Sequence, residues 1–185
     1  MKSSQSGRVG SGFFPTVTLA AEVLLLLASS AAMQADTDSR TPEVPAAIQV
    51  PGGTNKVHFH AYAEGVQIYV WNGSSWVFQA PEAVLFADVG AQGEIGIHYV
   101  GPTWESESGS KVVGARVAGV TVDATAIPWL LLKSTSTQGP GIFDRTTYIQ
   151  RVNTVGGLAP AAPGTIAGQE ARVPYTAEYY FYREQ

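Results

Sequence analysis

The chain has 185 residues, of which 45% are hydrophobic and 14% charged, with a formal net charge of −4 and no cysteine. This length favours one domain with a core of its own. Because the sequence has no cluster of lysines and arginines, nucleic acid is not expected as a partner. The missing cysteines exclude a cysteine nucleophile, a zinc–thiolate site and an iron–sulfur centre.

Residues 1–35 have the layout of a secretory signal peptide. A positively charged start precedes an apolar run from 17 to 32, and small residues allow cleavage after Ala32 or Ala35. The run is short for a membrane span, although an uncleaved anchor is the alternative. We expect a secreted or periplasmic protein that keeps no stable membrane span after cleavage.

Residues 36–45 are polar with two prolines and predict a flexible lead-in to a single β domain at 46–185. Strand-forming segments then recur at short intervals. They cover 56–63, 65–71, 76–78, 94–100, 111–122, 128–134, 144–153 and 173–183. The Asn72-Gly73 pair is a strong hairpin signal that would set Trp71 opposite Trp76.

Residues 155–172 are rich in Gly, Ala and Pro and predict a long irregular loop with no packing pattern of its own. No window after the leader keeps the apolar spacing of a helix for more than about two turns. With 20 glycines and 11 prolines, the pattern predicts an all-β, single-domain sandwich or barrel with Greek-key-like connections and long loops.

Three histidines could form a metal site. His58 and His60 would share one face of a strand, and His98 is the remaining histidine of the chain. Three imidazoles suit zinc or copper. The alternative is that two polar residues simply face outward on an edge strand.

The segment 98–114 concentrates chemically active side chains between glycines. His98 with Glu105 could serve a hydrolase, and Glu105 with Glu107 could serve sugar chemistry; a solvated acidic turn is the alternative. The sequence contains no Gly-x-Ser-x-Gly elbow, dinucleotide fingerprint or Walker loop. We therefore expect no cofactor, and a nicotinamide dehydrogenase is improbable.

The segment 148–154 places Gln150, Arg151 and Asn153 close together, and such side chains recognise carboxylates, amides or sugar hydroxyls. Together with Trp104 and Lys111 they are the predicted ligand-binding residues. The alternative role for Arg151 is structural, bonding backbone carbonyls between loops.

Collinear motifs along the chain occupy 65–69, 81–86, 96–105, 109–114, 127–131, 148–154, 156–157 and 173–177. Together they resemble the domain-of-unknown-function family numbered 3455, which comprises exported proteins of bacteria and fungi. The resemblance runs from about residue 45 to 182 and implies a secreted single domain of uncharacterised activity. Some fungal relatives carry a malate dehydrogenase label, which the missing dinucleotide fingerprint contradicts.

The resemblance also exposes departures in this chain. Relatives commonly carry one cysteine where this chain has Val70 or Trp71, and another near Gly164. The two would form a disulfide in relatives, so the 155–172 loop here would lose a tether. The usual acidic residue before the Gly-Ser-Lys motif is Ser108 here, which weakens a catalytic role for that position.

The leading functional hypothesis is a non-catalytic exported domain that binds a small polar ligand, a glycan or an envelope partner. Aromatic faces with a few polar groups suit such ligands. The alternatives are a secreted hydrolase using His98 with Glu105 and a structural or inhibitor-like surface protein.

Overall fold

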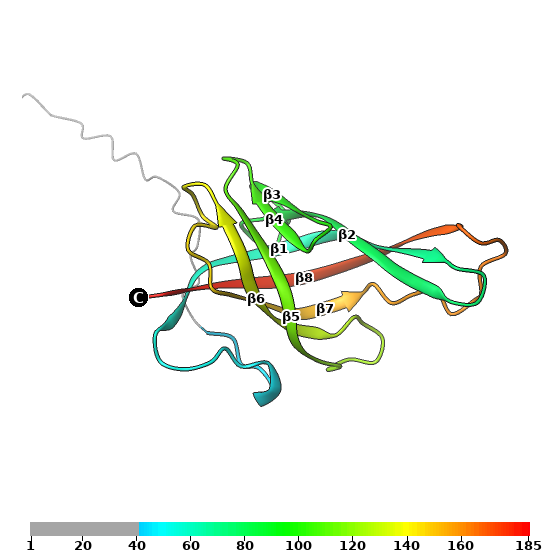
Figure 1. Ribbon diagram of the computed structural model, residues 1–185, viewed down its shortest axis with the longest axis horizontal. Coiled ribbons are helices and arrows are strands. Elements are labelled where there is room, and N and C mark those ends of the chain that lie inside the picture. The colour runs from blue at the N-terminus through cyan, green and yellow to red at the C-terminus, as the bar shows by residue number, and fades with distance from the viewer. Residues whose placement is uncertain (1–40) are drawn as a thin grey trace, which may run out of the picture. The chain divides into compact units, whose positions relative to one another are not determined.

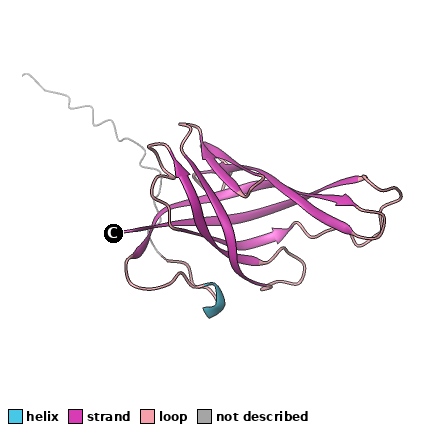
Figure 2. Ribbon diagram, in the orientation of Figure 1, coloured by secondary structure: helices cyan, strands magenta, loops and turns pink. Residues whose placement is uncertain are grey.

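The computed structural model describes residues 41–185, in which eight antiparallel strands close into a barrel (Figures 1 and 2). The elements are the 3-10 helix η1 (Ala46–Ile48) and the strands β1 (Asn55–Trp71), β2 (Trp76–Phe86), β3 (Glu94–Tyr99), β4 (Thr103–Ser106), β5 (Lys111–Val120), β6 (Trp129–Gln138), β7 (Tyr148–Gly156) and β8 (Glu170–Glu184). The all-β prediction is confirmed, and the barrel is the form that the sheet takes.

The predicted Greek-key-like connections are wrong. Each strand pairs with its neighbours in sequence, and β8 closes the sheet on β1. This up-and-down order arises because short connections join most consecutive strands, so each strand turns back beside the one before it.

Two strand predictions change in the structure. The segments predicted as 56–63 and 65–71 form the single strand β1, because Gly65 stays paired with Ala83 on β2 and with Tyr175 on β8. Strand β4 was not predicted, since its four residues lie within a segment interpreted as a turn. Trp104 is therefore a strand residue in the barrel wall.

The hairpin between β1 and β2 is confirmed. The Trp71 and Trp76 rings meet edge to face with centroids 5.4 Å apart. The Asn72 side-chain oxygen accepts hydrogen bonds from the backbone N–H groups of Ser74 and Ser75, each at 2.9 Å. The side chain of Asn72 thus closes the turn that its position in the sequence predicted.

The long connection from β7 to β8 is irregular, as predicted, but it packs against the β1–β2 hairpin (Figure 1). The Trp76 indole N–H donates to the Ala162 carbonyl at 2.9 Å, and the Trp71 carbonyl accepts from the Gly168 N–H at 2.8 Å. A Cβ added to Gly164 would lie 2.4 Å from the Trp71 ring. The structure therefore brings Trp71 and Gly164 into contact, and this packing together with the two hydrogen bonds holds the long connection against the hairpin.

The inward face of the barrel carries the main core. Its largest buried members come from six of the strands and from the β6–β7 connection: Phe59, Leu85, Trp104, Val112, Phe143, Ile149, Tyr179 and Phe181. The rings of Phe59, Phe143 and Phe181 contact one another. These side chains fill one part of the interior and leave another part open, where the candidate site lies.

A second apolar cluster lies outside the barrel wall. Its buried members are Val57, Val152, Tyr180 and Tyr182. Val44 and Val50, from the segment before β1, pack against it. The predicted lead-in therefore makes packing contacts by residue 44. The predicted signal peptide lies outside the described residues. No helix in the part of the chain that the structure describes is long and apolar enough to cross a membrane.

Candidate functional site

A cavity of about 570 Å³ enters the barrel between strands from both halves of the chain. Its polar lining consists of Gln67, Tyr69, Gln79, His98, Trp104, Arg116, Arg151 and Tyr179. Its apolar lining includes Phe78, Pro81, Ile127, Pro128, Leu130 and Leu132. This size and mixture of surfaces are those of a small-molecule pocket.

His98 lies in the cavity wall on β3 and is 3% exposed. Its Nδ1 lies 2.8 Å from the Thr103 carbonyl oxygen, so this nitrogen carries the hydrogen and donates it. Burial lowers the pKa of His98 to about 3, with Arg151 adding to the decrease and the Thr103 carbonyl opposing it. The ring is therefore neutral near pH 7, with its lone pair on Nε2.

Trp104 stacks on His98 across the β3–β4 pair, with ring centroids 4.3 Å apart and planes 10° apart. It is 1% exposed, and its indole N–H has no hydrogen-bond partner. Gln67 on β1 is 2% exposed, and its side-chain nitrogen also lacks a partner. The Tyr175 phenol lies close to the Gln67 amide, but its position does not satisfy the geometry of a hydrogen bond from Gln67 Nε2. The cavity wall thus contains two buried donors that the protein leaves unpaired, which is uncommon in native proteins.

Arg151 reaches the cavity from β7 and is 9% exposed. Its Nε and Nη2 donate to the Pro128 carbonyl at 3.2 and 2.8 Å. This contact agrees with the structural role considered for Arg151, but the same side chain also lines the cavity. Among residues 41–185 no carboxylate forms an ion pair with it. The wall therefore holds a buried positive charge with no negative partner.

Trp104 and Arg151 are the predicted binding residues that the structure brings together. Lys111, Gln150 and Asn153 lie elsewhere and do not line this cavity. Gln150 donates from Nε2 to the Ile48 carbonyl at 2.6 Å and accepts from the Tyr182 hydroxyl. It therefore ties the segment before β1 to the outside of the barrel.

Asn153 faces outward because a bulge interrupts the pairing of β7 with β8 after Val152. Its backbone has a positive φ of 49°, and its side chain donates to Glu178 at 2.9 Å. Period-two alternation predicted that Asn153 shares a face with Arg151, and the inserted residue breaks that alternation.

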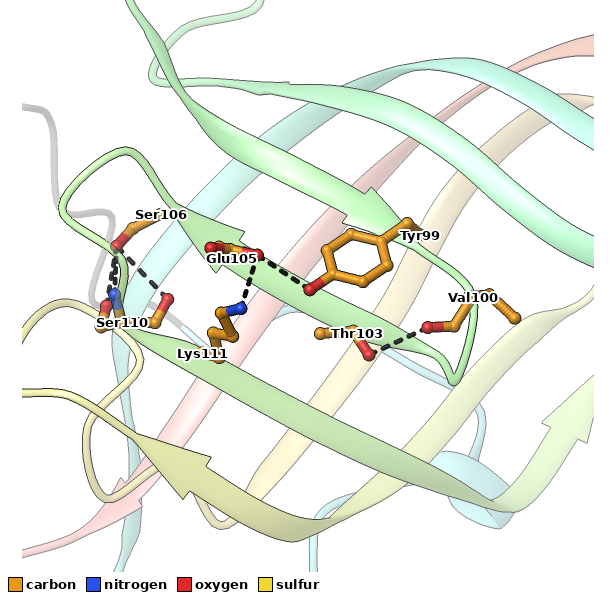
Figure 3. A network of polar contacts seen from close by, with 7 residues as sticks. All are labelled: Tyr99, Val100, Thr103, Glu105, Ser106, Ser110 and Lys111. Carbon is orange, nitrogen blue, oxygen red and sulfur yellow. Dashed lines mark hydrogen bonds and ion pairs between the residues drawn. The ribbon is translucent and has the colours of Figure 1, made fainter.

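Glu105 and Lys111 form a contact on the opposite face of the β4 wall from Trp104 (Figure 3). The Glu105 carboxylate lies 3.1 Å from the Lys111 ammonium and accepts from the Tyr99 hydroxyl at 2.8 Å. Both contacts lower the pKa of the Glu105 carboxyl, and the hydrogen bond from Tyr99 contributes the most. The pairing of β3 with β4 sets His98 opposite Trp104 and Ile97 opposite Glu105. His98 and Glu105 therefore lie on opposite faces of the wall, and the predicted hydrolase pair is not assembled.

The β4–β5 turn is held by its serines rather than by charged groups. The Ser106 hydroxyl bonds the Ser108 hydroxyl at 2.9 Å and the Ser110 hydroxyl at 2.8 Å (Figure 3). Ser110 is fully buried. Ser108 is thus one member of a hydroxyl network that shapes the turn.

The Glu105→Gln substitution provides a prediction for this outer face. Because Glu105 is on the solvent side and makes no contact with the cavity, ligand affinity should stay within about twofold of the wild type. Calorimetric titration of any ligand that the barrel binds would check this. A loss of tenfold or more would show that the outer face takes part in binding.

The three histidines do not come together. A bulge between Val57 and Phe59 interrupts the pairing of β1 with β8. His58 then bonds the Thr146 hydroxyl at 3.3 Å, whereas His60 bonds Glu178 at 2.9 Å. Within the described residues no three His, Asp or Glu side chains are grouped to hold a metal ion.

Five further polar residues of the cavity were not predicted as binding residues: Gln67, Tyr69, Gln79, Arg116 and Tyr179. Gln67 and Tyr69 alternate with Val66, Ile68 and Val70, and hydrophobicity favours the aliphatic face as the buried one. The structure instead turns the Gln67–Tyr69 face inward. A glutamine on the same strand face as Ala61, Ala63 and Gly65 was the available signal, because small residues predict the crowded inside of a narrow barrel.

These features define a closed antiparallel β-barrel with an internal, partly polar cavity. The family described as "Protein of unknown function (DUF3455)" matches residues 51–183, and the chain belongs to this family. No curated protein and no solved structure matches the chain.

Proposed function

We propose that this protein is exported and that its barrel binds a small polar ligand, or a glycan unit, in the internal cavity without chemically changing it. The proposal of export rests on the charged start, apolar run and small residues of 1–35. The proposal of binding rests on the cavity and its lining.

The observation that carries the binding proposal is the pair of unpartnered donors on Gln67 and Trp104. A buried N–H without an acceptor costs about 1–3 kcal/mol, and a ligand acceptor in the cavity would recover that cost. A protein that evolved only for stability would not be expected to leave both donors unpaired in one cavity.

The lining also supports binding rather than catalysis. It contains no carboxylate, serine or cysteine. His98, which could act as a base, has its pKa lowered to about 3 by burial and holds a backbone carbonyl. A base with so low a pKa is a poor match to proton transfer near pH 7.

The test is a binding screen of small metabolites and short glycans by ligand-observed NMR, followed by calorimetry. The Leu130→Trp variant would fill the cavity, because Leu130 lines it. Lys111→Ala alters the outer face and is the matched control. A true cavity ligand should lose at least tenfold in affinity with Leu130→Trp and less than twofold with Lys111→Ala. A screen with no binder, or a binder indifferent to a folded Leu130→Trp variant, would refute binding in the cavity.

A further inference from the structure

The cavity has a one-sided charge. Its lining includes the cations Arg151 and Arg116 and no Asp or Glu, although the whole chain carries a net charge of −4. Arg116 is exposed, at the cavity's entrance, while Arg151 is buried deeper in the wall. Positive potential is therefore concentrated where a ligand would enter and settle.

The Arg151 guanidinium is held by neutral groups only, the Pro128 carbonyl and the Tyr179 hydroxyl. Two of its five N–H groups share the Pro128 carbonyl, which holds the plane of the guanidinium in place. The remaining N–H groups have no carboxylate partner in residues 41–185. A buried charge without a counter-ion is costly, and a ligand carboxylate would supply both the counter-charge and the acceptors that this planar fork matches.

The uncharged part of the lining indicates the chemistry of the ligand beyond its carboxylate. Gln67 and Trp104 offer two more N–H donors, from β1 and β4. Leu130, Leu132 and Ile127 form apolar wall beside them. A lining that combines N–H donors with aliphatic and aromatic side chains suits an anionic head joined to an apolar body.

Resting on the proposed function, we propose that the ligand is a small organic monocarboxylate with an apolar or aromatic body, its carboxylate bound by Arg151 and its body against the apolar wall. A neutral sugar fits less well, because it would leave the buried Arg151 charge without a counter-ion. A phosphate dianion fits less well, because one buried guanidinium balances one negative charge.

The test uses matched pairs that differ in charge but hardly in shape. Benzoate, 3-phenylpropanoate and hexanoate are titrated by calorimetry against benzamide, 3-phenylpropanamide and hexanamide, at pH 7 and constant ionic strength. Inorganic phosphate is a separate arm. At least one acid is expected to bind ten times more tightly than its amide, and phosphate more weakly than that acid.

The Arg151→Met variant keeps a side chain of similar length and removes the charge. It should lower affinity for the preferred acid at least tenfold while leaving affinity for its amide within threefold. Lys111→Met, on the outer face, should change neither. If Arg151→Met does not fold, Gln67→Leu replaces it, with an expected loss of at least threefold for the acid.

Three results would overturn the proposal. Acids and amides that bind within threefold of each other would show that charge is not recognised, and the cavity would remain a binding site for neutral ligands. Phosphate that binds more tightly than every acid would assign the site to a different anion. Failure of every acid and amide, while a sugar from the screen binds in the cavity, would also refute the carboxylate and leave the proposed function standing.

Discussion

Replacing Gly65 with alanine is expected to destabilise the barrel by at least about 3 kcal/mol. A Cβ at this position would lie 2.1 Å from the Glu82 carbonyl oxygen and 2.5 Å from the Ala83 Cα. Both atoms belong to the backbone of β2, which is hydrogen-bonded to β1 at this point. The strands cannot separate to make room without losing those bonds. Urea unfolding monitored by tryptophan fluorescence would measure the loss.

Gly90→Ala is the matched control for this prediction. A Cβ there would meet the Asp88 carboxylate oxygen, at 3.1 Å, and a side chain can move aside where a backbone cannot. Its cost should stay below about 1 kcal/mol. If Gly65→Ala proves as mild as Gly90→Ala, β1 and β2 do not approach as closely at Gly65 as described.

Stability should fall as the pH decreases from about 6.5 to 5, before most carboxylates titrate. Burial lowers the pKa of His98 to about 3 and that of His58 to about 4, from an ordinary value of 6.5. Below pH 6.5 the unfolded chain protonates both rings and the folded chain does not. Unfolding therefore takes up protons, and the fully buried His98 removes about 2 kcal/mol of stability by pH 5, with a smaller loss from the partly exposed His58. Above pH 6.5 this loss is absent.

Unfolding free energies of the His98→Asn variant between pH 5 and 7.5 would isolate one of the two histidines. Asparagine keeps a donor for the Thr103 carbonyl, which His98 Nδ1 now bonds, and does not titrate. The variant loses the stacking on Trp104 and should be less stable at pH 7.5, but its stability should depend on pH no more than half as strongly as that of the wild type. If the unfolding free energy changes with pH equally steeply in both proteins, His98 is not a buried, neutral residue.

The hairpin and the all-β class were predictable because their signals are local. Asn72-Gly73 specifies a tight turn through its own side chain and a glycine with positive φ, and the flanking tryptophans pair across it. Strand β4 was not predictable in the same way. Its four residues are too few to show alternation, and Trp104 is recognisable as an inward residue only once His98 stacks on it from β3.

The candidate site was predicted in part. Trp104 and Arg151 were named from residue type and neighbourhood, and both line the cavity. Lys111, Gln150 and Asn153 were named on the same grounds and lie outside it. Residue type marks a side chain that is able to bind a ligand, but it does not say which side of a barrel wall that side chain occupies.

The sequence by itself determined the β class, the β1–β2 hairpin, the family and two residues of the cavity, because turn chemistry, strand propensity and motif order are properties of short segments. Only the tertiary structure decided which side chains face inward. One inserted residue, as in the bulges after Val57 and Val152, reverses every later side chain of a strand. Closure of β8 on β1 then brings Gln67, Trp104 and Arg151 from distant segments into one cavity.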